Sequence, residues 1–127
     1  MATLEQHLTH KPAQTEREWW ALLKSGDKSI VRSIEDWHAL VRSKENPLAG
    51  CDQKAVEAFT NSLRFSNGGL GHADYGNLKN QLTYAQFSNL WSRFGLGMTL
   101  FEDHDGYYCQ GKGTCTTRNE NICTSNC

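Results

Sequence analysis

The last nineteen residues of this chain constrain its folding more than any other part of the sequence. They read CQGKGTCTTRNENICTSNC and contain four of the five cysteines, Cys109, Cys115, Cys123 and Cys127. Apart from the cysteines, Ile122 is the only strongly apolar residue in this stretch. A segment with so few apolar side chains cannot bury enough surface to fold by itself. We therefore expect it to be disulfide-bonded, metal-bound, chemically modified or without ordered structure.

The spacing of the four tail cysteines, C-x5-C-x7-C-x3-C, bears on the first two of these interpretations. Structural zinc sites place cysteines in closely spaced pairs, because a short knuckle directs two thiolates at one metal ion. Only Cys123 and Cys127 have such a spacing, and we predict no metal site. Two disulfides among the four cysteines are the alternative, with the connectivity left open. Disulfides would require an oxidising compartment.

The remaining interpretation uses the hydroxyl residues that alternate with the cysteines. A dehydrated Ser or Thr is an electrophile, and a cysteine thiolate can add to it to form a thioether ring. In its layout, a long helical leader followed by a short Cys/Thr/Ser-rich core, the chain resembles a precursor of a ribosomally synthesised, post-translationally modified peptide. The resemblance implies a modifying enzyme as the partner, which docks on the helical part. The modified or cross-linked positions would be Cys109, Cys115, Cys123, Cys127, Thr114, Thr116, Thr117, Thr124 and Ser125.

The rest of the chain has the pattern of short helices. Thr15 and Thr83 each precede a Glu or Gln by three residues, which is the capping-box spacing of a helix start. Gly26 and Gly95 are placed to end those two helices. Asp27 and Asp52 predict two further helix starts, the first for residues 28–44. A short helix is expected at 78–82, a glycine-rich loop at 66–77, and a strand or extended strap at 98–101.

These patterns predict an all-α protein, a small four- or five-helix bundle with an irregular Cys-rich C-terminal tail. The predicted organisation is a helical domain at residues 13–97, followed by an extended segment and the tail at 98–127.

Composition excludes several classes of partner. Thirteen Lys and Arg balance fourteen Asp and Glu, so we expect neither nucleic-acid nor membrane binding. The longest apolar run has five residues, Trp19 to Leu23, against the roughly twenty that cross a bilayer. The first twenty residues are too charged for a signal peptide, which predicts a cytoplasmic protein as written, with export after processing as the alternative.

The other candidate residues favour structural roles. Cys51 is interpreted as a small apolar residue at a helix start, in preference to a thiolate served by His72. The glycines at 68–71 are interpreted as turn residues and the acidic run 102–106 as a solvated turn. No nucleophile, base and orienting group occur at convincing spacing, so we expect no enzyme and no cofactor.

The functional hypothesis is a non-enzymatic substrate or carrier protein whose helical part docks the modifying enzyme. Its alternatives are a secreted, disulfide-stapled interaction protein, such as a toxin or effector, and a small metal- or thiol-redox-handling protein.

Overall fold

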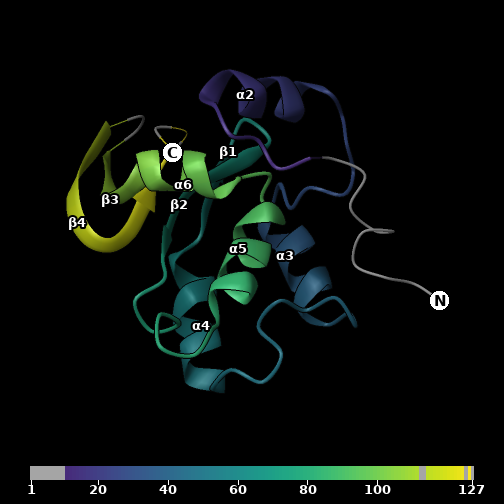
Figure 1. Ribbon diagram of the computed structural model, residues 1–127, viewed down its shortest axis with the longest axis vertical. Helices are drawn as coiled ribbons and strands as arrows, with labels where there is room; N and C mark the ends of the chain where they lie inside the picture. Colours follow the sequence, from purple (N-terminus) through teal and green to yellow (C-terminus); the bar gives the residue numbers. More distant parts are fainter. Residues whose placement is uncertain (1–10, 112–113, 125, 127) are drawn as a thin grey trace.

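The computed structural model describes residues 11–111, 114–124 and 126 of the 127-residue chain. Within these residues, groups of helices alternate along the chain with pairs of strands, and the strands form one antiparallel sheet (Figure 1). The helices are α2 (Glu16–Lys24), α3 (Ile34–Val41), α4 (Gln53–Ser62), α5 (Tyr84–Ser92) and α6 (Met98–His104). The strands are β1 (Arg64–Ser66), β2 (Gly69–Asp74), β3 (Asp105–Gly111) and β4 (Thr114–Cys123). Among the described helices, none is long and apolar enough to span a membrane.

The prediction of an all-α helix bundle is wrong, because the protein is a mixed α/β structure. Its four strands have the spatial order β1-β2-β4-β3, so β4 lies inside the sheet and pairs with β2 on one side and β3 on the other. The sheet thus joins strands from both sides of residue 97. That residues 13–97 form a helical domain of their own stays a prediction.

The region predicted to be a glycine-rich loop, 66–77, contains most of the first hairpin. Asn67 and Gly68 form its turn, and both have positive φ angles, 52° and 79°. Such angles match the twist of the two strands, and the Asn-Gly pair is a strong hairpin signal. A glycine is needed at position 69 because α2 packs closely on β2: a Cβ atom on Gly69 would lie 2.7 Å from the side chain of Leu23. These glycines therefore serve strand pairing and close packing.

The prediction of an irregular tail is also wrong, because residues 114–123 form β4. Ile122 and Cys123 are almost fully buried, and Ile122 belongs to the main hydrophobic core. The apolar surface that the tail lacks is supplied by the rest of the chain. The backbone amides and carbonyls of β4 pair with those of β2 and β3, and this pairing requires no apolar side chains.

Two of the residues that follow β4, Thr124 and Asn126, are held against the first hairpin. The Thr124 hydroxyl donates to the Leu70 carbonyl at 2.7 Å. The Asn126 amide donates to the Ser66 carbonyl, and its oxygen accepts from Asn67 Nδ2 at 2.9 Å. Both Thr124 and Asn126 are buried, and these bonds satisfy polar groups away from water.

The helix-start predictions had mixed outcomes. The caps at Thr15 and Thr83 are confirmed, and Gly26 and Gly95, predicted to end these helices, follow the ends of α2 and α5 with positive φ angles. The helix predicted at 28–44 spans only α3 and is capped by Ser33, because Asp27 instead caps a turn through Ser29. Residues 78–82 form turns rather than a helix, and the strap predicted at 98–101 is the start of α6.

Candidate functional site

Two of the predicted tail cysteines are joined by a disulfide inside one strand. Cys115 and Cys123 both belong to β4, and their Cα atoms lie 5.7 Å apart. Eight residues of straight strand would separate them by about 26 Å. The strand therefore turns back on itself, as its curved arrow shows (Figure 1). Cys109 lies opposite Cys115 in the β3–β4 ladder and is also disulfide-bonded, whereas Cys127 lies outside the described residues.

The predicted hydroxyl residues do not gather at one place. The first part of β4, before its bend, is here called the outer arm and contains Thr114, Thr116 and Thr117. Thr116 and Thr117 pair there with Tyr108 and Tyr107 of β3. Thr124 is buried beyond the other end of the strand. Ser125 lies outside the described residues.

The bend in β4 lies between its two arms, around residues 118–120. Glu120 has a φ angle of 64°, a left-handed conformation that costs a residue with a side chain about 1 kcal/mol. Its carbonyl accepts from the Tyr75 amide at 2.9 Å, which helps to hold this conformation. The outer arm is braced by Arg118, whose guanidinium carbon lies 5.1 Å from the centre of the Tyr108 ring. Strained backbone of this kind is concentrated at functional sites.

The bend forms one wall of a cleft in two parts, here called the Tyr75 cleft. Both parts contact Tyr75, Lys79 and Asp105. The apolar part has a volume of about 250 Å³ and the polar part about 390 Å³. The remaining lining residues are Leu82, Thr83, Tyr84, Phe87 and Phe101 in the apolar part, and Gly106, Asn119 and Glu120 in the polar part.

Tyr75 stands where the two parts meet. Its ring packs against Phe87 and Phe101, with ring centroids 5.3 and 5.7 Å away, and its hydroxyl donates to Asp105 Oδ1 at 2.5 Å. Burial raises the pKa of Tyr75, and the hydrogen bond to Asp105 and the nearby negative charges of Asp105, Glu120 and Asp74 raise it further. The Tyr75 hydroxyl therefore stays protonated at neutral pH and acts as a donor.

Glu120 is positioned by two contacts from the 75–79 segment. Its Oε2 accepts from Lys79 Nζ at 3.2 Å. Its Oε1 lies where Gly76 leaves room, since a Cβ atom on Gly76 would be 2.9 Å from that oxygen. Gly76 also donates its amide to Asp74 Oδ1 at 3.0 Å. The absent side chain of Gly76 thus allows two carboxylates to approach the backbone beside Tyr75.

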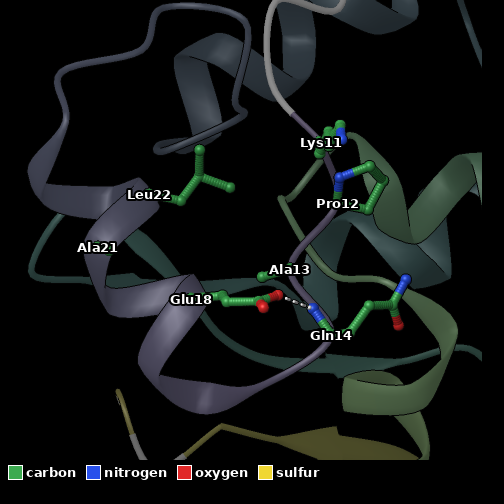
Figure 2. Close-up of a pocket in the computed structure, with 7 residues that line it drawn as sticks. All are labelled: Lys11, Pro12, Ala13, Gln14, Glu18, Ala21 and Leu22. Carbon is green, nitrogen blue, oxygen red and sulfur yellow. Dashed lines mark hydrogen bonds between the residues drawn. The ribbon is translucent and has the colours of Figure 1, made fainter.

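A hollow of about 620 Å³, larger than either part of the cleft alone, lies beside α2 and contains fewer groups that could orient a ligand (Figure 2). Its lining is Lys11, Pro12, Ala13, Gln14, Glu18, Ala21 and Leu22. The Glu18 carboxylate already accepts from the Gln14 amide at 2.9 Å, and Lys11 is the other charged residue of the lining. We therefore take the Tyr75 cleft as the candidate site.

The other titratable residues considered from the sequence lie outside this cleft. Cys51 is a free thiol, and burial raises its pKa, which disfavours the thiolate. The ring nitrogens of His72 lie 2.9 Å from the Ser62 carbonyl oxygen and 2.9 Å from Asn121 Oδ1, so His72 links α4 to β2 and β4. Among the described residues, no three His, Cys, Asp or Glu side chains are grouped closely enough to hold a metal ion.

Most of the residues of this site were not predicted from the sequence. Asp105 was noted only as part of an acidic turn, whereas Tyr75, Lys79 and Glu120 were not considered. Tyr75 and Glu120 are 45 positions apart, as their numbers show, and only the strand order brings them together. The Asn-Gly hairpin signal was the one local clue to this sheet.

Comparison with protein-family models, with curated proteins and with solved structures finds no match for this chain. The candidate site therefore rests on its own geometry.

Removal of the disulfide should destabilise the protein. The Cys115→Ala/Cys123→Ala double variant loses a cross-link that closes a short loop, which is expected to lower the free energy of unfolding by about 2.5 kcal/mol. Urea denaturation followed by tryptophan fluorescence measures this. Cys51→Ala is the control, and a double variant as stable as the parent chain would contradict a stabilising role for the bond.

Stability should fall at alkaline pH because of Tyr75. Its pKa is raised in the folded protein, whereas in the unfolded chain it ionises near pH 10. Above about pH 10 the unfolded state therefore loses a proton that the folded state keeps, and stability decreases by up to about 1.4 kcal/mol per pH unit from this group. Tyr75→Phe should remove this slope and Tyr84→Phe, at an exposed residue, should not. Equal slopes in parent and Tyr75→Phe would refute the assignment.

Proposed function

We propose that this chain is a non-enzymatic, disulfide-stabilised binding protein whose ligand site is the Tyr75 cleft. The observation that carries the proposal is that the Cys115–Cys123 bond closes the bend of β4, and the bend places Glu120 beside Tyr75 and Asp105. A cross-link that pre-organises a cleft lowers the entropy that ligand binding must otherwise overcome. This is the disulfide-stapled interaction protein considered above as an alternative, and it implies an oxidising compartment.

The chemistry of the cleft favours binding over catalysis. The Tyr75 hydroxyl is a poor acid, because its pKa is raised, and it already donates to Asp105. Asp105 in turn accepts that bond, so this pair is suited to orienting a ligand. Apolar side chains on one side and a few fixed polar groups on the other are typical of small-molecule sites.

The modified-precursor hypothesis makes a different claim about the same residues. Thr116 and Thr117 lie on the outer arm of β4 beside Cys115, whose sulfur is bonded to Cys123, so a thioether at Cys115 would have to form before that disulfide. In the folded protein the Thr124 hydroxyl is buried and bonded to Leu70, so modification at Thr124 would have to precede folding.

Intact mass spectrometry of the protein from its native host separates the two proposals. The binding-protein proposal predicts a mass lower than that of the reduced chain by two hydrogens per disulfide, and reductant should restore these. Loss of one water per Ser or Thr, unchanged by reductant, would instead support the modified precursor and contradict our proposal.

A solvent-mapping experiment tests the cleft itself. Small neutral organic probes, phenol and isopropanol, should shift the backbone amide resonances of residues 75–87 and 101–106 in an NMR titration of the oxidised full chain. Apolar pockets with oriented polar groups attract such probes in preference to flat surface. Shifts centred on the hollow beside α2, or spread evenly over the surface, would refute the proposed site.

A further inference from the structure

We propose that the Tyr75 cleft is specific for a small organic cation, a primary ammonium group carried on an aromatic body. The inference rests on the proposed binding function and names the class of ligand. It follows from three features of the cleft: its charge, the carboxylate oxygens that remain open, and the apolar part next to them.

The charge around Tyr75 is negative. Asp105 and Glu120 line the cleft, and Asp74 lies close enough to raise the pKa of the Tyr75 hydroxyl together with them. Among the described residues, Lys79 is the one cationic residue in the lining of either part. Three carboxylates against one ammonium group leave a local excess of two negative charges. In a partly buried cleft this excess favours a cationic ligand and repels an anionic one.

Each lining carboxylate has one oxygen engaged and one open. Asp105 Oδ1 accepts from Tyr75, and Glu120 Oε2 accepts from Lys79. Within the described part of the structure, no hydrogen bond occupies Asp105 Oδ2 or Glu120 Oε1. An ammonium group has three donors and therefore can donate to an open carboxylate oxygen of this kind. The Lys79–Glu120 contact already shows that an amine fits beside this carboxylate.

The apolar part supplies a surface for the rest of the ligand. Phe101 is buried, Phe87 is half-buried, and Tyr84 is 70% exposed. An exposed large aromatic side chain beside two packed aromatic rings provides a flat surface on which a ligand ring can stack. The volume of about 250 Å³ suits a single aromatic ring with a short chain. The ring would lie in this part and the ammonium group would reach the polar part.

A metal ion is a less suitable occupant. The described carboxylates are not grouped closely enough for three of them to share one ion. An organic ammonium ion does not require a compact shell of ligands, because it binds through a few directional N–H donors.

Three probes of similar size test the charge preference in isothermal titration of the oxidised full chain: 2-phenylethylammonium, 2-phenylethanol and 3-phenylpropionate. We expect the ammonium to bind about fivefold more tightly than the alcohol, as one partly exposed ion pair would give, and the carboxylate to bind most weakly. Equal affinity for ammonium and alcohol would overturn the cation inference and leave the cleft a binding site. No binding of any probe would overturn the proposed function as well.

Variants of the two lining carboxylates locate the effect. Asp105→Asn keeps an acceptor for Tyr75, and Glu120→Gln keeps the side-chain shape at a half-buried position. Each should reduce the ammonium preference over the alcohol to less than half. Asp103→Asn, an exposed carboxylate on α6 outside the lining, is the matched control and should leave the preference unchanged. An equal loss in the control would overturn the assignment.

Tyr84→Ala separates the apolar contribution from the charge. Because Tyr84 is largely exposed, its loss should leave the stability of the fold nearly intact. Affinity for 2-phenylethylammonium and for 2-phenylethanol should fall by the same factor. Unchanged affinity for both would refute the stacking surface, and thermal unfolding of every variant confirms that it is folded.

Discussion

The packing of Trp91 against five other aromatic rings is the interaction on which the rest of the structure depends. Its ring lies 4.9 Å from that of Phe101 and within about 6 Å of the rings of Phe59, Tyr75, Phe87 and Phe94. These residues come from three helices and from the segments on either side of α5. Large aromatic side chains contribute both buried area and preferred ring geometry, so one residue fixes the relative positions of several elements. The edge of this cluster, formed by Tyr75, Phe87 and Phe101, lines the apolar part of the cleft.

The second constraint is the central position of β4. A segment with one strongly apolar residue folds here because its neighbours supply the core and its backbone completes the sheet. The cross-link between Cys115 and Cys123 then fixes the bend that the sequence of the strand does not itself favour. Glu120 occupies a left-handed backbone conformation at that bend, where a glycine or asparagine would be expected. The left-handed conformation therefore destabilises β4 locally, and it places the Glu120 carboxylate in the cleft.

The sequence predicted the parts of the fold that depend on local chemistry. The helix starts at Thr15 and Thr83 follow from hydrogen bonds over three residues, so a single sequence shows them. The Asn67-Gly68 turn was equally local, but its neighbouring glycines were interpreted as a loop because they carry no hydrophobic period. The site could not be predicted in this way. Asp105 and Glu120 approach Tyr75 only through the pairing of β2, β3 and β4, and strand order is not a local property.

The disulfide and the cleft share one strand, which couples covalent chemistry to ligand binding. Cys115 and Cys123 lie on either side of the bend that carries Asn119 and Glu120. Opening the bond leaves the inner arm paired with β2 and with Asp105 of β3, and the outer arm paired with the rest of β3, but removes the sulfur cross-link between the arms. The sheet can then persist while the bend relaxes from its left-handed conformation. Because binding to a less ordered cleft costs more entropy, the oxidised chain is the form suited to hold a ligand.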